Sequence, residues 1–209
     1  MSFVIAVDGP AAAGKGTLAR RLAAAFGLAY LDTGLLYRAV GRRVLDAGGE
    51  PSDPVAAAAA AHALLPEDLA RTDLRGPDAD RASSLVATMP SVRAALLAFQ
   101  RSFADQGAVL DGRDIGTVVV PDAQVKLFVT AAPATRARRR WLELQARGDV
   151  TALAPVEADL QARDAQDAAR AAAPLAMADD AVVLDTTALD ADATFALAVE
   201  IVRSRSGSA

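Results

Sequence analysis

Short apolar runs alternate with helical patterns along most of the chain. The runs that are typical of buried strands cover residues 3–7, 29–31, 108–110, 125–129 and 182–184. Each run is followed by a polar or glycine-bearing turn and then by a segment of helical periodicity. Strands separated by helices predict an α/β fold with a parallel five-stranded sheet that is flanked by helices. Because ligands of such sheets bind beyond the carboxyl ends of the strands, we expect the functional residues directly after these runs.

Two segments depart from this alternation. Residues 48–90 are helical and loop-like with several prolines, and residues 134–173 form a charged helical pair that we expect to be broken at Gly148 and Pro155. We interpret both segments as excursions from a single domain, each lying over one substrate. The core of that domain then comprises residues 1–47, 91–133 and 174–209.

A glycine-rich loop follows the first apolar run, and a helix predicted over residues 17–26 opens directly behind it. Gly9 and Gly14 bracket a turn in which successive backbone N–H groups point into one concavity, where the helix N-terminus adds partial positive charge. Lys15 is then placed to reach the outer phosphates of a nucleoside triphosphate. A glycine-rich helix start with an incidental lysine is the plainer alternative, but the flanking strand and helix favour nucleotide binding.

The residue after Lys15 narrows the class of nucleotide-binding protein. In the usual motif that residue carries a hydroxyl that binds magnesium, whereas here it is Gly16 and the hydroxyl follows at Thr17. The metal must therefore rely more on water and phosphate oxygens. This spacing favours a small-molecule phosphotransferase over a switch GTPase.

Composition excludes several other kinds of protein. The hydrophobic content is 53%, but the excess is alanine and no apolar stretch reaches the ~18 residues that span a bilayer. The N-terminus does not resemble a signal peptide, and the absence of cysteine excludes disulfides and thiolate sites, so we expect a cytoplasmic protein without membrane contacts. The net charge of −4 argues against nucleic acid as a partner. Among the basic residues only Lys15 and Lys126 are lysines, so anion recognition must fall largely to arginine.

Three polar clusters lie where the fold predicts a site. Residues 31–38 follow the second run, with Thr33 as the expected N-cap of a helix that carries Arg38. Residues 111–114 follow the third run. On a helix, Arg163, Asp167 and Arg170 would share one face. Taken alone, ordinary capping, a solvated turn and a self-contained salt-bridge stripe would explain the three clusters.

Taken in order, these motifs resemble the bacterial cytidylate kinase family over nearly the whole chain. The matching segments are Gly9-Pro10-x3-Gly14-Lys15-Gly16-Thr17, Leu31-Asp32-Thr33-Gly34-x2-Tyr37-Arg38, Asp111-Gly112-Arg113-Asp114-x-Gly116-Thr117-Val118-Val119-x-Pro121-Asp122-Ala123 and Arg163-Asp164-x2-Asp167-x2-Arg170. The run from Asp111 to Ala123 is much more specific than a phosphate loop alone. The resemblance implies a P-loop kinase fold with a monophosphate-binding insert and a lid, and transfer of the γ-phosphoryl group of ATP to CMP or dCMP, with Mg²⁺ as cofactor, in pyrimidine nucleotide metabolism.

The resemblance also implies a role for individual residues. The residues that would bind ATP are Gly9, Pro10, Ala11, Ala12, Ala13, Gly14, Lys15, Gly16 and Thr17 in the loop, with Arg139 and Arg140 in the lid. The residues that would bind CMP are Thr33, Arg38, Ser84, Arg93, Arg113, Asp114, Arg163, Asp167 and Arg170. Of these, Ser84, Arg93 and Asp114 match positions that read the cytosine edge, and Arg163 and Asp167 match positions that hold the ribose. The residues expected to act in catalysis are Lys15, Arg38, Arg113 and Arg170, and no protein side chain is expected to bind a metal directly.

The sequence departs from the family in the insert and in the lid. Leu64 to Asp80 is short, is broken by proline and glycine, and lacks the strand pair that relatives carry there, so we expect an insert of helices and a loop. Gln166, Ala168 and Ala169 stand where many relatives carry further charges. A UMP/CMP kinase or an AMP kinase of the same fold remains an alternative, as does a nucleotide-binding switch, and we expect a monomer.

Overall fold

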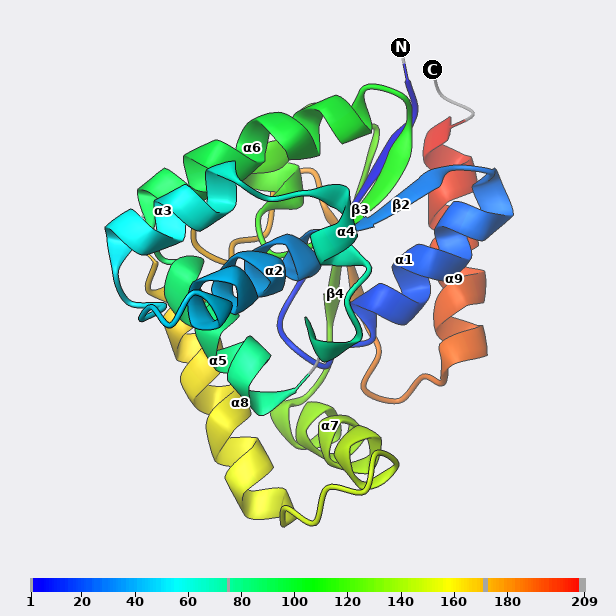
Figure 1. The fold of residues 1–209 in the computed structure, drawn as a ribbon. Helices are drawn as coiled ribbons and strands as arrows, with labels where there is room; N and C mark the ends of the chain where they lie inside the picture. The colour runs from blue at the N-terminus through cyan, green and yellow to red at the C-terminus, as the bar shows by residue number, and fades with distance from the viewer. Residues whose placement is uncertain (1, 75, 171–172, 207–209) are drawn as a thin grey trace. The chain divides into compact units, whose positions relative to one another are not determined.

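The computed structural model describes residues 2–74, 76–170 and 173–206. The chain forms two compact units (Figure 1). One unit comprises Met1–Leu31 and Gln106–Ala209, and the other comprises Asp32–Asp105. We call them the sheet unit and the helical unit. The predicted insert, residues 48–90, falls inside the helical unit, which begins earlier and ends later.

The sheet unit is built on a five-stranded parallel sheet with the strand order β2-β3-β1-β4-β5. The strands are β1 (Val4–Asp8), β2 (Ala29–Asp32), β3 (Ala108–Asp111), β4 (Val125–Thr130) and β5 (Val182–Asp185). The predicted sheet is confirmed, and each strand continues one residue beyond its apolar run. As a result β1, β2, β3 and β5 all end on an aspartate, which places carboxylates at the edge of the sheet where ligands bind.

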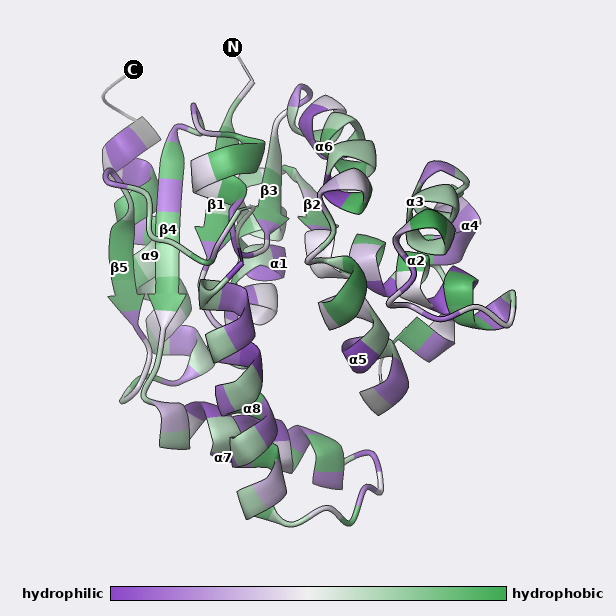
Figure 2. Ribbon diagram, turned by 90° about the vertical axis from the view of Figure 1, so that its left-hand side faces the viewer, coloured by the Kyte–Doolittle hydropathy of each residue, from purple (hydrophilic) through white to green (hydrophobic). Residues whose placement is uncertain are grey.

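Helices α1 (Lys15–Phe26) and α9 (Ala191–Ser206) lie side by side on one face of the sheet (Figures 1 and 2). Apolar side chains from both helices and from the strands form the core between them, among them Ile5, Leu22, Val129 and Val202, none of which is exposed. Figure 2 shows that the strands are predominantly hydrophobic, and β1 and β3 are buried along their whole length. The remaining elements are the π-helix η2 (Ile115–Val119), α7 (Pro133–Gln145) and α8 (Leu153–Ala168).

Two predictions about the charged helical pair were wrong in detail. The chain does not break at Pro155, because α8 already begins at Leu153 and proline is tolerated in a first helical turn, where its missing N–H would have no partner. The helix also ends at Ala168, so Arg170 lies beyond it and does not share its face. Arg170 nevertheless forms an ion pair with Asp167.

The helical unit contains α2 (Thr33–Asp46), α3 (Pro54–His62), α4 (Pro66–Leu69), the 3₁₀ turn η1 (Thr72–Leu74), α5 (Pro77–Val86) and α6 (Pro90–Ala104). Proline stands in the first turn of α3, α4, α5 and α6, a position where it is well tolerated. Leu36 and Val40 of α2 pack with Val86 of α5 and Leu96 of α6 to form a separate apolar core. Among the described residues of 48–90, none belongs to a strand, as expected for an insert of helices and loops.

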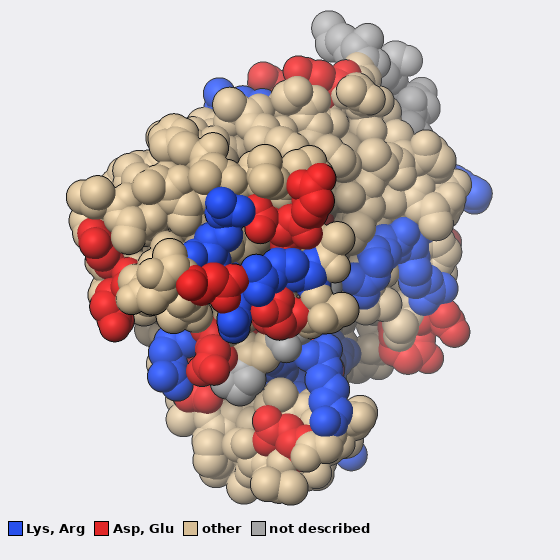
Figure 3. Space-filling model, viewed as in Figure 1, with Lys and Arg blue, Asp and Glu red and all other residues tan. Residues whose placement is uncertain are grey.

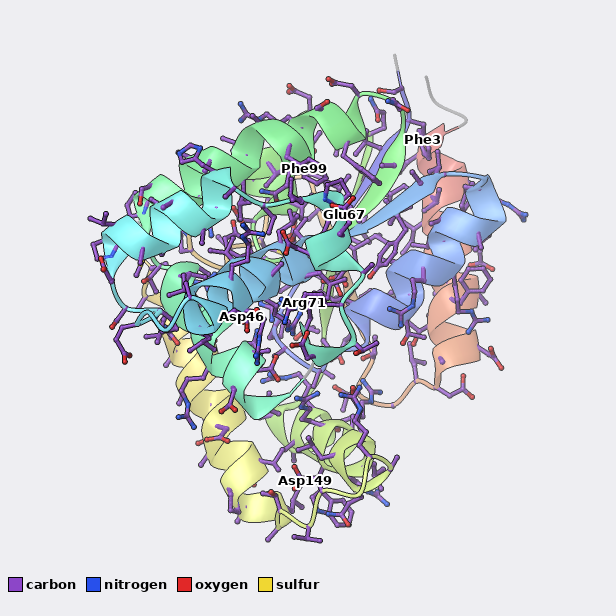
Figure 4. All side chains as sticks on the ribbon, viewed as in Figure 1. Phe3, Asp46, Glu67, Arg71, Phe99 and Asp149 are labelled. Atoms are coloured by element: carbon purple, nitrogen blue, oxygen red, sulfur yellow. The ribbon has the colours of Figure 1, made fainter. Side chains whose placement is uncertain are left out.

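Ion pairs join α2 to the loop between α4 and η1 and to η1 itself. We call this set the α2 ion network, and its members are Arg42, Asp46, Arg71 and Asp73. Arg71 Nη1 lies 2.6 Å from Asp46 Oδ2, and Arg71 Nη2 lies 2.7 Å from Asp73 Oδ2. Arg42 pairs with the same two aspartates, at 2.7 Å and 3.2 Å. Figure 4 shows Asp46 and Arg71 next to each other, and Figure 3 shows basic and acidic side chains interspersed on this face. Ion pairs thus hold this loop to α2.

The described residues contain no single helix long and apolar enough to cross a membrane. One bent pair, Asp78–Val86 with Pro90–Ala104, passes the same test of length and composition when its two helices are taken together, with 97° between them.

Candidate active site

The loop between β1 and α1 has the backbone of a phosphate-binding turn. Gly9 has a φ of +141°, and a Cβ atom there would lie 1.9 Å from the carbonyl oxygen of Val129, so only glycine fits beside β4. Gly14 has a φ of +93° and directly precedes the first residue of α1. Between them Ala12 adopts a φ of +58°, which is uncommon for a residue with a side chain. The loop therefore presents the N-terminus of α1, as the sequence predicts.

Lys15 is the first residue of α1 and is buried, with 6% of its surface exposed. Its Nζ donates a hydrogen bond of 2.8 Å to the carbonyl oxygen of Pro10 in the same loop. Burial and the nearby guanidinium of Arg113 together lower the pKa of Lys15 to about 7, against the opposing charge of Asp111. The loop thus holds a lysine whose positive charge is disfavoured until an anion joins it.

Gly16 leaves space for the carboxylate of Asp111. A Cβ atom at Gly16 would lie 3.1 Å from Asp111 Oδ2, closer than side chains normally approach. Asp111 is buried at the end of β3, and Tyr30 donates a long hydrogen bond of 3.5 Å to the same oxygen. Asp111 belongs to the predicted polar cluster of residues 111–114, although no individual role was expected for it. Its position at the carboxyl end of a buried strand was the available signal, because the loop follows β1, and β1 and β3 are adjacent.

Asp8 is a second buried carboxylate, and it stands directly after the first apolar run, where functional residues are expected. It closes β1 and accepts hydrogen bonds of 2.8 Å from the backbone N–H groups of Ile115 and Gly116, the first two residues of η2. Burial raises the pKa of Asp8 to about 6, although both hydrogen bonds oppose the shift. This carboxylate joins the start of the phosphate loop to the segment that follows β3.

An arginine–aspartate cluster brings together three of the predicted CMP-binding residues. Arg113 Nε lies 2.8 Å from Asp167 Oδ2, and Arg170 pairs with the other oxygen of the same carboxylate. Burial alone would raise the pKa of Asp167, yet the charges of Arg113 and Arg170 hold it below its usual value. Arg163 contributes to the same effect and also depresses the pKa of Lys15. These positive charges are therefore concentrated close to the phosphate loop.

Asp114 lies between this cluster and η2. It is 5% exposed, and its carbonyl oxygen accepts from the N–H groups of Val118 and Val119 at 2.9 Å and 3.1 Å. Asp114 occupies the N-cap position of η2, but its side chain makes no capping hydrogen bond. The carboxylate predicted to read the cytosine edge therefore does not cap its own helix.

Helices α7 and α8, which cover the predicted lid region, contact the phosphate loop. Buried Arg136 pairs with Asp164 at 2.7 Å and donates to the carbonyl oxygen of Ala11 at 3.2 Å. An apolar cluster with Ala11, Val156 and Leu160 supports this contact. The predicted ATP contacts of Arg139 and Arg140 stay predictions: Arg139 donates to Thr186 and Leu189, and Arg140 pairs with Glu143 at 3.0 Å.

The helical unit carries the other predicted CMP-binding residues. Arg38 Nε lies 3.0 Å from Asp80 Oδ1, and Ser84 Oγ donates to the carbonyl oxygen of Asp80 at 3.0 Å, so Asp80 joins α2 to α5 at these two side chains. Arg93 donates to the carbonyl oxygen of Ala87 at 3.3 Å, and its guanidinium lies 5.6 Å from the centre of the Tyr37 ring.

The prediction that Thr33 caps α2 was wrong. Asp32 occupies the N-cap position, without a side-chain capping bond, and Thr33 is the first helical residue. Thr33 is buried, with 4% of its surface exposed. The helix therefore begins at the end of β2 with no intervening turn.

The described part of the chain contains no group of three or more histidine, cysteine, aspartate or glutamate side chains that could hold a metal ion. A catalytic metal would therefore depend on oxygen atoms of the nucleotide and of water, with at most one or two carboxylates. Magnesium accepts such an arrangement.

Comparison with known proteins places the chain in one family. The family model described as cytidylate kinase matches residues 5–204. The cytidylate kinase of Granulibacter bethesdensis is 65% identical over 98% of this chain and 99% of its own length. The cytidylate kinase of Acidiphilium cryptum is 62% identical over 96% of this chain and 95% of its own length. An uncharacterized protein from Eubacterium ventriosum, 12% identical, shares the fold with a TM-score of 0.57 over 97% of this chain and 99% of its own. The chain belongs to the cytidylate kinase family.

Proposed function

We propose that this protein transfers the γ-phosphoryl group of ATP to CMP or dCMP, giving ADP and CDP or dCDP. The observation that carries the proposal is the concentration of cationic groups at the end of β1. Buried Lys15 opens the helix of the phosphate loop, and the guanidinium groups of Arg113 and Arg163 lie close enough to depress its pKa. The phosphate groups of two nucleotides would supply further anions to pair with these cationic groups.

ATP occupies the phosphate loop in this proposal, with residues 9–17 around its phosphates. The backbone N–H groups at the start of α1 bind the phosphate oxygens, and the ammonium of Lys15 leaves the carbonyl of Pro10 to contact the outer phosphates. For Arg139 to contact ATP, its bonds to Thr186 and Leu189 must be exchanged for bonds to the nucleotide.

The proposal assigns to CMP the residues that the family resemblance implies. Arg38, Arg113 and Arg170 bind its phosphate, because a guanidinium group matches the geometry of two phosphate oxygens. Arg163 and Asp167 hold the ribose. Ser84, Arg93 and Asp114 read the base, and Thr33 lies near the acceptor phosphate.

Magnesium accompanies the ATP in this scheme. Asp111 fits a role beside the ion, because its buried carboxylate fills the space that a side chain at position 16 would need. Thr17 supplies the hydroxyl that the usual motif carries one place earlier. When bound, the ion would neutralise phosphate charge.

The residues of this chain have little covalent chemistry to perform. The attacking group is a phosphate oxygen of CMP that is already ionised, so no general base is required. The arginine side chains and Lys15 stabilise the charge on the transferred group, which is worth the most where water is excluded. Burial of Lys15 and of Asp167 is consistent with such a site.

The experiment that tests the proposal is an assay of ADP release with CMP, dCMP, UMP, AMP and GMP as separate acceptors. We expect turnover with CMP and dCMP and at least about 10² lower kcat/KM with the others. Lys15→Met serves as the inactive control. Equal activity with AMP or UMP would favour the alternative kinases. ADP release that does not depend on any monophosphate would favour a nucleotide-hydrolysing switch.

The proposal also includes a monomer that acts in the cytoplasm. A solution mass of 21.5 kDa by light scattering would agree with a monomer, and a doubled mass would contradict it. The absence of cysteine from the chain is compatible with a reducing compartment.

A further inference from the structure

We propose that Asp8 is a positioning residue whose carboxylate fixes residues 113–119 against the phosphate loop, and that this fixation sets both the binding of CMP and the discrimination between cytosine and uracil. This inference rests on the proposed function, because it concerns the segment that carries Arg113 and Asp114. Asp8 itself contacts neither nucleotide in this account.

The first observation is that Asp8 caps a helix to which it does not belong. The first N–H groups of a helix have no partners within it and are commonly satisfied by the side chain at the N-cap. In η2 the N-cap is Asp114, whose side chain makes no such bond. Asp8 accepts from Ile115 N and Gly116 N instead, both at 2.8 Å. The N-terminus of η2 is thus capped by Asp8 and not by Asp114.

The second observation is that the backbone at Gly116 is closely packed, so that a side chain there would push against its neighbours. A Cβ atom at Gly116 would lie 3.3 Å from Asp8 Oδ2 and 3.0 Å from Lys126 Cδ. Lys126 is buried on β4, and its Nζ pairs with Asp180 at 2.9 Å. The backbone at Gly116 therefore lies between the methylene groups of Lys126 and the carboxylate of Asp8.

The third observation is that the ionised carboxylate does not favour folding. Asp8 is 5% exposed, and burial raises its pKa to about 6, with the charge of Asp114 adding to the shift and that of Lys15 opposing it. Because the folded pKa lies above the unfolded value of 3.8, the protonated form stabilises the fold at low pH. That stabilisation is lost as the pH rises through 6. At neutral pH the ionised carboxylate of Asp8 therefore does not add to the stability of the fold. We attribute its presence to the two hydrogen bonds by which it holds residues 113–119.

The test is Asp8→Asn, which preserves shape but turns one acceptor into an NH₂ group that faces a backbone N–H. We expect KM for CMP to rise about tenfold and the CMP-to-UMP ratio of kcat/KM to fall several-fold, with KM for ATP changed by less than about twofold. Asp185→Asn is the matched control, since Asp185 also closes a strand and accepts a backbone N–H, from Thr187 at 2.8 Å. It should have the kinetics of the unmodified protein.

Gly116→Ala provides a second variant, which pushes the segment away from Asp8 without altering the carboxylate. It should change KM for CMP and the CMP-to-UMP ratio in the same direction, and it decides the matter if Asp8→Asn does not fold. A lower melting temperature in both variants with unchanged KM and ratio would show a merely structural role and overturn the proposal.

Asp114→Asn, measured in parallel, separates this inference from the proposed function. If Asp114→Asn leaves the CMP-to-UMP ratio unchanged, the assignment of Asp114 to the base is wrong, and the role of Asp8 proposed here falls with it. If Asp114→Asn narrows the ratio while Asp8→Asn and Gly116→Ala do not, only the role of Asp8 is refuted.

Discussion

The surroundings of the Lys15 side chain favour its neutral form until an anion binds beside it. Its ammonium is turned back onto the carbonyl oxygen of Pro10, and burial lowers its pKa to about 7. At pH 8 such a lysine is about nine-tenths unprotonated. Phosphate groups placed beside it favour the charged form, so the pKa must rise when ATP binds.

The first prediction is that ATP binding at pH 8 takes up close to one proton. Titration calorimetry in buffers of different ionisation enthalpy measures this uptake. Lys15→Arg is the matched control, since arginine keeps its charge at this pH and should bind ATP without the uptake. Equal proton uptake in the unmodified protein and in Lys15→Arg would show that another group titrates.

The second prediction concerns Arg170, which shares the carboxylate of Asp167 with Arg113. Arg170→Ala should lower kcat more than it raises KM for CMP, because its charge acts on the transferred group. A loss on the order of 2 to 4 kcal/mol in transition-state stabilisation is typical for such a group. Arg170→Lys should recover part of it, since the charge returns without the planar fork. A change confined to KM would make Arg170 a binder of the ground state only.

Residue types and spacing predicted the phosphate loop, whereas only the family resemblance grouped Arg113 with Arg170. The sequence could not give a role to Asp8 or Asp111, although both follow predicted strands. Asp8 acts on Ile115 and Gly116, more than a hundred positions along the chain, through the adjacency of β1 and β3. The position of Asp111 beside the phosphate loop follows once β1 and β3 are known to be adjacent. Thr33 was misplaced by one position, because helix ends depend on local hydrogen bonds that composition does not resolve.

At the scale of elements, the α2 ion network joins α2 to the segment that follows α4. Each of its four side chains is about a third exposed or more, so individual pairs contribute little and are screened by salt. Hydrogen bonds from Arg71 lower the pKa of Asp73 to about 2, which keeps this carboxylate charged at any physiological pH. The segment from Glu67 to Leu74 is therefore joined to α2 by several weak ion pairs, and its attachment should depend on salt.

The third prediction is that Arg71→Ala accelerates amide hydrogen exchange between Glu67 and Leu74, with little effect on the sheet unit. Addition of about 0.5 M salt to the unmodified protein should act in the same direction. Arg147→Ala is the control, since it removes an exposed ion pair with Glu143 in the sheet unit. Exchange in this loop that is unaffected by both the variant and the salt would mean that packing alone holds it.

Hydrophobic periodicity along the sequence does not fix the residues at which strands and helices begin and end. The apolar runs located all the strands but stopped one residue short at each carboxyl end, because the closing residue is polar and only the ladder of hydrogen bonds reveals it. Pro155 was taken as a break, although a proline can equally stand in the first turn of a helix. Both errors concern local context and leave the order of elements intact.

For the whole molecule, the alternation of strands and helices was sufficient to predict the α/β class and the parallel sheet. It could not give the strand order β2-β3-β1-β4-β5, which depends on packing between distant segments. The division after Leu31 and Asp105 was also not foreseen, because α2 and α6 carry the same periodicity as helices that cover the sheet. Their apolar faces instead form the core of the helical unit.

The central claim is phosphoryl transfer to a cytosine nucleotide whose base is read by Asp114. An aspartate accepts from the amino group of cytosine but meets a carbonyl oxygen in uracil, whereas an asparagine can donate to that oxygen. The decisive measurement is kcat/KM for CMP and for UMP in the unmodified protein and in Asp114→Asn. We expect the unmodified protein to favour CMP by on the order of 10² or more, and the variant to narrow that ratio by at least about tenfold. An unchanged ratio would contradict the account.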